Sequence, residues 1–136
     1  MYGPYQDLNR MIPFVINNCL KNKKFACSSG LQYRDFLYVD DFVKSIIYLL
    51  KKNNFVGQCF NIGSGKALQI KEIIKLIQKK IKKGTPEFGK IQLRSDENLI
   101  TYPDISKINS VVRWRPKVSF KVGLDKTIYF YKKNKV

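Results

Sequence analysis

The sequence predicts an α/β fold in a single domain of 136 residues. Short apolar runs of strand length alternate along the chain with longer amphipathic runs of helix length, and this alternation is typical of α/β proteins. Hydrophobic residues make up 44% of the sequence, which is enough for an ordinary core. Neither a repeat nor a low-complexity linker divides the chain.

Apolar periodicity predicts the helices. In the run 70–81 the isoleucines follow the 3.6-residue period, so a strongly amphipathic helix is expected there. A second helix is expected over 12–20, with Pro13 in its first turn. A third follows Asp40, whose carboxylate would act as the N-cap. Its expected apolar face consists of Phe42, Val43, Ile46, Ile47, Leu49 and Leu50.

Shorter signals complete the expected elements. Ser106 is expected to cap a short helix, and a last helix is expected over about 123–132. The run YGPYQ at 2–6 has the composition of a turn. Short apolar runs predict the strands, at 25–27, 36–39, 58–62 and 90–93.

The net charge of +16 raises the question of a nucleic-acid partner. Of the 26 basic residues 21 are lysines, and abundant lysine, isoleucine and asparagine are what an AT-rich coding sequence produces. The densest runs, 21–24 and 79–83, stand at expected element ends, where lysine suits a helix C-terminus. Readers of nucleic acid usually carry arginines, aromatic platforms or a recognisable motif. The charge is therefore interpreted as a solvated surface, and nucleic acid is an unfavoured partner.

Several classes of function are excluded by composition. The cysteines, Cys19, Cys27 and Cys59, are odd in number and widely spaced, which indicates neither a disulfide framework nor a zinc site. No histidine is present, so histidine-based catalysis and histidine-ligated metals are excluded. No apolar run reaches the roughly 20 residues of a membrane span, and the N-terminus lacks a signal-peptide pattern. A reduced, cytoplasmic chain without membrane contact is expected.

The run FNIGSGKALQI at 60–70 has the strand, glycine and helix order of a phosphate-binding loop. A Walker loop is excluded because its two end positions are occupied by Phe60 and Ala67. A dinucleotide loop would need a third glycine where Leu68 stands. The glycines are therefore interpreted as turn residues between a strand and a helix.

Two arginines are conspicuous because arginine is scarce here. Arg34 precedes the expected strand 36–39, and Arg94 follows the expected strand 90–93. A guanidinium can bind a phosphate or carboxylate in a bidentate manner, which lysine cannot do. The alternative is local charge balance, with Asp35 beside Arg34 and Glu97 three residues after Arg94.

A family resemblance rests on motifs that occur in order along nearly the whole chain. They are YGP at 2–4, IPF at 12–14, SGLQYRDFLYVDD at 29–41, FNIGSG at 60–65, and DISKI followed by WRP and GL at 104–124. This series resembles the C-terminal part of the extended short-chain dehydrogenase/reductases, the NAD-dependent sugar-nucleotide epimerases and dehydratases. The form S-x-G-x-Q-x-R-D-F at 28–36 is similar to that of members making deoxysugars for surface polysaccharides.

The resemblance implies roles for four residues of this chain. Arg34 matches the arginine that contacts the diphosphate of the nucleotide sugar. Arg94 matches an arginine near the phosphates, and Glu97 matches an acid on the ribose hydroxyls. Asn61 matches a position that lines the nucleotide pocket. Asp40 is interpreted as a helix cap rather than a catalytic group.

The chain departs from the family pattern in lacking the redox machinery. The family's glycine-rich NAD(P) loop and its catalytic Ser/Thr and Tyr-x-x-x-Lys lie upstream of YGP. Tyr48 and Lys52 have the Tyr-x-x-x-Lys spacing but stand in the helix after R-D-F, which is the wrong place. The resemblance thus implies a substrate-binding portion of a Rossmann-type enzyme without the N-terminal NAD-binding half. No catalytic residue, cofactor-binding residue or metal ligand is expected in this chain.

Three hypotheses of function follow. The first is the nucleotide-sugar-binding part of an NAD(P)-dependent epimerase, dehydratase or reductase, inactive alone. The intact enzyme would be a homodimer, and a separately encoded N-terminal half is a possible partner. The second is a small basic protein that binds nucleic acid or anionic surfaces, and the third is a remnant that binds nothing. The sequence names neither the base, the sugar nor the reaction.

Overall fold

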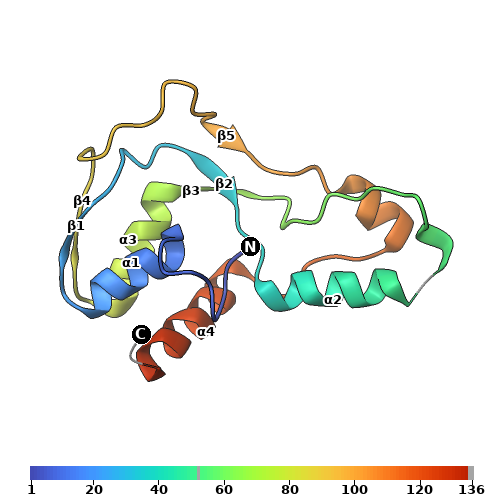
Figure 1. The fold of residues 1–136 in the computed structure, drawn as a ribbon, viewed down its shortest axis with the longest axis horizontal. Helices are drawn as coiled ribbons and strands as arrows, with labels where there is room; N and C mark the ends of the chain where they lie inside the picture. The colour runs from blue at the N-terminus through green and yellow to red at the C-terminus, as the bar shows by residue number, and fades with distance from the viewer. Residues whose placement is uncertain (52, 135–136) are drawn as a thin grey trace.

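Helices α1, α3 and α4 pack together, and α2 extends away from them (Figure 1). The computed structural model describes residues 1–51 and 53–134. Its helices are α1 (Met11–Leu20), α2 (Val39–Leu50), α3 (Ile70–Ile81) and α4 (Phe120–Lys133), with short turns η1 (Asn53–Phe55) and η2 (Ile108–Val112). Its strands are β1 (Lys24–Ala26), β2 (Tyr33–Asp35), β3 (Ala67–Gln69), β4 (Thr85–Glu87) and β5 (Ile100–Thr101). The α/β class predicted from the sequence is confirmed.

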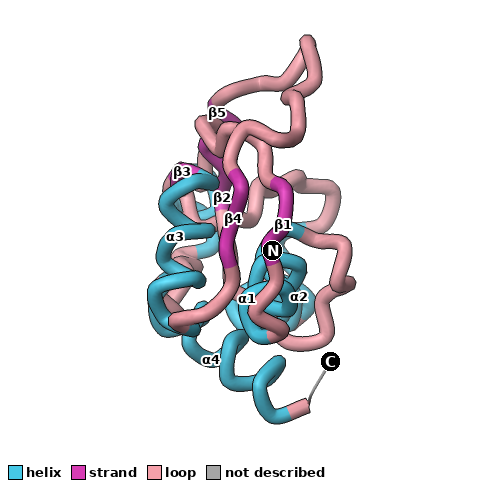
Figure 2. Tube along the Cα trace, turned by 90° about the vertical axis from the view of Figure 1, so that its left-hand side faces the viewer, coloured by secondary structure: helices cyan, strands magenta, loops and turns pink. Residues whose placement is uncertain are grey.

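The strands form two small sheets. β1 pairs with β4 in parallel, and β2 is the centre of a three-stranded sheet, antiparallel to β3 and parallel to β5. Arg34 lies opposite Leu68 on one side and Thr101 on the other. Figure 2 shows β5 near the top of the molecule and α4 at its lower end. Arg34 therefore lies in the central strand, β2, with a neighbouring strand on each side.

Of the strands predicted from the sequence, 25–27 is confirmed, one residue earlier, as β1. The prediction of a strand at 36–39 is wrong, because the ladder lies at Tyr33–Asp35 and residue 39 already begins α2. The apolar side chains of Leu37 and Tyr38 are buried against helices and not in a sheet. Backbone pairing in this run is limited to an isolated bridge between Tyr2 and Tyr38.

The predicted strands at 58–62 and 90–93 are also wrong. Neither run belongs to a ladder among the described residues. Within 90–93, the backbone N–H of Ile91 donates to Cys27 O over 3.1 Å. The strand after α3 is β4 instead, which the sequence reading missed.

The helix predictions succeed in position and fail at the caps. The helices at 12–20 and 70–81 are confirmed as α1 and α3. Asp40 is not the N-cap of α2: that position is Tyr38, and Asp40 lies in the first turn, where a carboxylate suits the helix dipole. α4 begins earlier than predicted, at Phe120, because Ser119 Oγ accepts a hydrogen bond from Val122 N.

The main core lies between α1, α3 and α4. It is formed by Tyr2, Ile12, Val15, Ile16, Cys19, Phe25, Cys27, Tyr38, Ile73, Ile74, Ile77, Ile81, Leu124, Ile128 and Tyr131. Tyr2 connects the N-terminus to α4, since its hydroxyl donates to Phe120 O over 3.0 Å. Burial, with smaller effects from Tyr38 and Asp41, raises the pKa of Tyr2, so this hydroxyl stays a protonated donor. Of the cysteines, Cys59 is exposed, and all are free thiols.

A second, smaller core lies between α2 and η2. Its buried residues are Leu37, Ile108, Val112 and Trp114, with Phe42, Leu49, Phe55, Phe60, Ile62 and Ile105 partly buried around them. Only part of the apolar face predicted for α2 contributes to it. The rest, hereafter the α2 apolar face, is Val43, Ile46, Ile47 and Leu50, with exposed fractions of 47%, 37%, 47% and 77%. This face has no covering element among the described residues.

The two fully buried side chains of α2, Asp41 and Ser45, are both polar. Asp41 is 2% exposed. Its Oδ2 accepts hydrogen bonds from Lys117 N (2.9 Å) and Val118 N (2.7 Å). The carboxylate therefore fastens the start of α2 to the segment that leads into α4. Among the described helices, none is long and apolar enough to cross a membrane.

We predict that Asp41→Ala lowers the free energy of unfolding of the chain by about 2–3 kcal/mol, because two buried N–H donors lose a charged acceptor. Urea denaturation followed by circular dichroism measures the change. Asp40→Ala is the matched control, since Asp40 is exposed and loses only a dipole interaction of about 0.3–1 kcal/mol. Equal losses for the two variants would contradict the fastening role of Asp41.

We predict that the chain alone is marginally stable or self-associates, because uncovered apolar faces and strand edges favour association. Replacing both Ile46 and Ile47 by Ser should shift sedimentation-velocity profiles toward the monomer. Tyr129→Ser is the control: Tyr129 is 67% exposed on α4 and lies outside this face. A clean wild-type monomer with a sharp, reversible melt would refute the prediction.

Candidate functional site

Arg34 extends from β2 toward residues 97–99. Its Nη2 forms an ion pair with Glu97 Oε1, and the two side chains are 27% and 26% exposed. Its Nη1 donates to Tyr33 O over 2.8 Å and, less closely, to Leu99 O over 3.4 Å. The structure thus brings together two of the predicted site residues, 63 positions apart in the sequence.

The stretch that contacts Arg34 continues through residues 97–105, hereafter the 97–105 segment. Asn61 contacts the far end of this segment. Its Nδ2 donates to Asp104 O over 3.2 Å. The segment first contacts Arg34 through Glu97 and Leu99, then forms β5. It therefore connects three of the four predicted residues: Arg34, Asn61 and Glu97.

Arg94 is less closely tied to this group. It is exposed, and its carbonyl accepts a hydrogen bond from Glu97 N over 3.1 Å, so the two residues share one turn. Within residues 1–51 and 53–134 its guanidinium has no hydrogen-bond or ion-pair partner. A single diphosphate-sized space shared by Arg34 and Arg94 remains a prediction.

The sequence reading missed the role of Asp35. Its Oδ1 accepts from Ser64 N over 3.0 Å, and its Oδ2 accepts from Ser64 Oγ over 2.7 Å and from Lys66 N over 3.4 Å. The sequence alternative was that Asp35 balances the charge of Arg34. In the structure its carboxylate instead binds the turn at 63–66. The sequence signals for this contact are the adjacent Arg34-Asp35 pair and the G-S-G run at 63–65. Because they are about 29 positions apart, no local pattern shows that they meet.

The glycines of this 63–66 turn are required by close packing. A Cβ on Gly63 would lie 2.3 Å from Pro103 Cγ, and one on Gly65 would lie 2.8 Å from Ile105 Cδ1. Gly65 also has a φ of +70°, which disfavours other residues. The glycines do lie in a turn, but no described strand precedes it and it leads into β3 rather than directly into a helix. The turn packs on the 97–105 segment.

Asp104 fixes the far end of that segment. Its Oδ1 accepts from Ser106 Oγ over 2.6 Å and from Ser106 N over 2.8 Å. These two hydrogen bonds hold the pKa of the Asp104 carboxyl below its usual value. The prediction that Ser106 is the cap is therefore wrong, because Asp104 is the acceptor at this turn.

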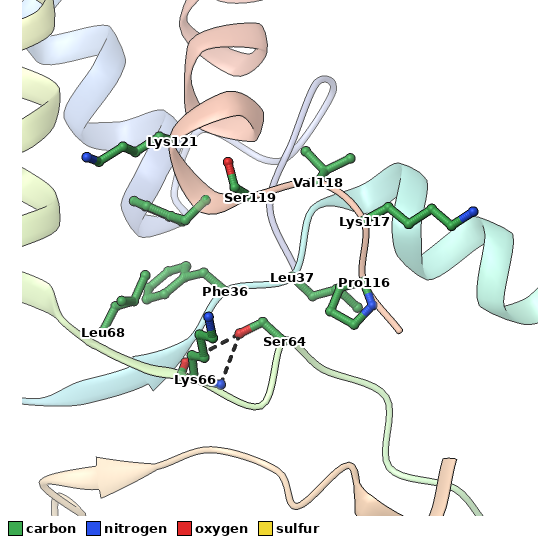
Figure 3. Close-up of a pocket in the computed structure, with 11 residues that line it drawn as sticks. Phe36, Leu37, Ser64, Lys66, Leu68, Pro116, Lys117, Val118, Ser119 and Lys121 are labelled. Carbon is green, nitrogen blue, oxygen red and sulfur yellow. Dashed lines mark hydrogen bonds between the residues drawn. The ribbon is translucent and has the colours of Figure 1, made fainter. Parts of the chain in front are cut away.

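A separate hollow of about 400 Å³ lies between the 63–66 turn and the segment 116–121 (Figure 3). It is lined by Phe36, Leu37, Ser64, Lys66, Leu68, Pro116, Lys117, Val118, Ser119, Phe120 and Lys121. None of the four predicted site residues lines it. The dashed lines in Figure 3 mark the contacts of Ser64 Oγ with the backbone of Lys66. The hollow therefore shares no lining residue with the predicted site, although Ser64 and Lys66 of the 63–66 turn line it.

The next question is whether the described residues could hold a cofactor or a metal ion. The Ser64 amide donates to Asp35, and the Lys66 amide is shared between Ser64 Oγ and Asp35 Oδ2, so the 63–66 turn does not fit a cofactor phosphate. Within residues 1–51 and 53–134 no group of three potential metal ligands is found. Lys52, the second member of the Tyr48 spacing, lies outside the described residues. Arg34 supplies guanidinium donors and Glu97 supplies carboxylate acceptors, and in this structure the two side chains are paired with each other.

Comparison with known proteins identifies the family and the fold that this chain resembles. Residues 1–63 match the family model described as NAD dependent epimerase/dehydratase family. The resemblance recognised from the sequence motifs is confirmed: the match and the relatives below are consistent with a fragment of an extended short-chain dehydrogenase/reductase. The Rossmann-type assignment of the fold is confirmed as well.

Two curated relatives illustrate the similarity. A human dTDP-D-glucose 4,6-dehydratase is 35% identical over 141 residues, covering 98% of this chain and 40% of that protein. A CDP-abequose synthase of Salmonella muenchen is 27% identical over 130 residues, covering 94% of this chain and 44% of that protein. The chain thus spans about two fifths of the length of these relatives.

Two solved structures have the same fold. A dTDP-glucose 4,6-dehydratase of Bacillus anthracis in complex with NAD is 30% identical, with a TM-score of 0.88 over 98% of this chain and 42% of that one. A UDP-glucose 4-epimerase of Thermotoga maritima with UDP-glucose is 25% identical, with a TM-score of 0.89 over 99% and 44%. More than half of each of these proteins has no counterpart in the present chain.

Proposed function

We propose that residues 1–136 form the nucleotide-sugar-binding portion of an NAD(P)-dependent sugar-nucleotide epimerase, dehydratase or reductase. The observation that supports this most directly is the meeting of Arg34 and Glu97 on the 97–105 segment, which also contacts Asn61. These three residues come from distant parts of the sequence. Each matches a family position for the diphosphate, the ribose or the nucleotide pocket.

The proposed division of roles follows from charge and hydrogen-bonding capacity. The Arg34 guanidinium binds diphosphate oxygens through parallel N–H donors. The Glu97 carboxylate, an acceptor only, takes the protons of ribose hydroxyls. Arg94 adds a second positive charge near the diphosphate, and Asn61 contacts the nucleotide. Substrates of this class are consistent with the names of the relatives, which act on dTDP-, UDP- and CDP-linked sugars.

The redox step of the intact enzyme lies outside this chain in this proposal. A nicotinamide cofactor supplies hydride transfer, and the family's tyrosine supplies the acid and base. No residue described here takes part in that step, and the 63–66 turn is not a cofactor loop. The product class suggested by the S-x-G-x-Q-x-R-D-F form is a deoxysugar for surface polysaccharides.

The proposed partner of the α2 apolar face is the rest of the family fold, encoded in the same protein or separately. Support comes from the 37–77% exposure of its four side chains and from the larger size of the relatives. The run 58–62, extended in sequence pattern but unpaired here, is a second surface for that partner. The completed enzyme is expected to be a homodimer.

The alternative of an anionic partner has one observation in its favour. The lysine runs 21–24 and 79–83 converge where α1 and α3 end, because Gly84 N donates to Asn22 Oδ1 over 3.0 Å. A basic surface of this kind would bind nucleic acid with a steep dependence on salt and no preference for nucleotide sugars. The two lysine runs contain no arginine, whereas the main proposal rests on Arg34 and Arg94.

We predict that the purified chain catalyses no epimerisation, dehydration or reduction of UDP-glucose or dTDP-glucose, with or without NAD. The reason is that the cofactor loop and catalytic tyrosine of the family are missing from the chain. Product analysis by chromatography against an enzyme-free blank tests this. Reproducible turnover that follows the protein through purification would refute it.

We predict that Arg34→Ala weakens the binding of UDP-glucose or dTDP-glucose by about 10- to 150-fold, since a charge-assisted contact to phosphate contributes roughly 1.5–3 kcal/mol. Arg34→Lys should restore only part of the affinity, because an ammonium lacks the planar fork. Isothermal titration of the 136-residue chain measures both variants.

The control for this titration is Lys79→Ala, which removes a solvated charge and should leave affinity unchanged. If Arg34→Ala changes stability slightly and affinity not at all, Arg34 is only a partner of Glu97. If Lys79→Ala weakens binding as much as Arg34→Ala, with strong salt dependence, the basic surface is the binding site. Absence of wild-type binding would refute nucleotide clamping by this chain.

A further inference from the structure

The 63–66 turn presents an arrangement in which backbone amides surround an anion. Amides of Ser64 and Lys66 and the hydroxyl of Ser64 all point to the two oxygens of Asp35, which lies 29 to 31 positions earlier. Hydrogen bonds to a carboxylate are stronger than neutral ones. The loop that resembles a phosphate loop in sequence is therefore occupied by an anion from within the chain.

The turn held by Asp35 is held from the other side by the 97–105 segment. Pro103 and Ile105 leave no room for a side chain at Gly63 or Gly65. Two residues before the turn, Asn61 reaches Asp104 O. A displacement of the turn therefore displaces Asn61 relative to the segment.

Asp35 is also the strand neighbour of Arg34. Successive side chains of a strand point to opposite faces. Arg34 accordingly contacts Glu97 and Leu99 O, while Asp35 contacts the turn. The two adjacent residues therefore hold different parts of one assembly, which consists of β2, the 63–66 turn and the 97–105 segment.

We propose that Asp35 is a positioning residue: its carboxylate, by filling the amides of the 63–66 turn, sets the places of Asn61 and the Arg34 guanidinium along the 97–105 segment. As a role in nucleotide-sugar binding, this rests on the proposed function. Asp35 is not assigned a contact with the substrate, because its oxygens are engaged by three donors of the turn. Its effect on binding is exerted through Asn61 and Arg34.

The test is Asp35→Asn in the 136-residue chain, with Asp40→Asn as the matched control on an exposed aspartate. The amide keeps the size of the side chain but replaces one acceptor oxygen by a donor that faces donors. In ¹⁵N NMR spectra we expect the side-chain resonances of Asn61 and Arg34 to shift and the amides of Ser64 and Lys66 to exchange about tenfold faster or more. Amides of α1 should be unchanged, which excludes general unfolding.

The second readout is affinity for uridine and thymidine 5′-diphosphate, measured by isothermal titration. Asp35→Asn should weaken binding by about fivefold or more, and its effect should be less than additive with that of Asn61→Ala, because one acts through the other. With Lys79→Ala the effects should add. A role limited to stability would give no such coupling at temperatures where the variants are folded.

The outcomes are distinct. If Asn61 and Arg34 resonances are unmoved, or if binding occurs and Asp35→Asn leaves it unchanged or strictly additive with Asn61→Ala, the positioning role is refuted. If the wild type binds neither diphosphate, the proposed function fails, and the spectra alone decide whether Asp35 positions the two residues. If Asp35→Asn does not fold, Ser64→Ala, which removes one of the three donors, must move the same two side-chain resonances, or the proposal is wrong.

Discussion

The pairing of β2 on both of its edges is the constraint on which the rest of the candidate site depends. Its three residues, Tyr33–Asp35, pair with β3 on one side, and two of them, Tyr33 and Arg34, pair with β5 on the other. One neighbour leads directly into α3, and the other lies within the 97–105 segment. Because the backbone of β2 is committed to its neighbours, its function is carried by side chains. Arg34 and Asp35 extend from it toward different parts of the chain.

The scarce acidic residues determine much of this architecture. The chain has 26 basic and 10 acidic residues, so most of its cations have no carboxylate partner. Asp41 fastens α2 to residues 117 and 118, Asp35 fastens the 63–66 turn, and Glu97 pairs with Arg34. Each of these carboxylates joins segments far apart in the sequence. In so basic a chain, the contacts of the few carboxylates show which distant segments are joined, whereas the positions of the many lysines do not.

The uncovered surfaces agree with the partial coverage of the relatives. The main core is closed by α1, α3 and α4, whereas the core beside α2 is small and leaves the α2 apolar face in solvent. The hydrophobic effect favours covering such a face. In the proposed function, this face is covered by the part of the family fold that the chain does not match, since the chain spans about two fifths of its relatives.

The sequence by itself determined the α/β class, the family and the long helices, because these depend on local signals. The isoleucines of α3 repeat every turn over twelve residues, which is enough to define its ends. The sequence predicted β1 but misplaced or missed the other strands, which at two or three residues are too short to show a period, and it failed for caps such as Asp40. Only the tertiary structure decided that Arg34 pairs with Glu97 and that Asp35 holds Ser64, since these contacts join residues 63 and 29 positions apart. Local patterns predict local hydrogen bonds, whereas the partner of a side chain in a distant segment depends on how the whole chain packs.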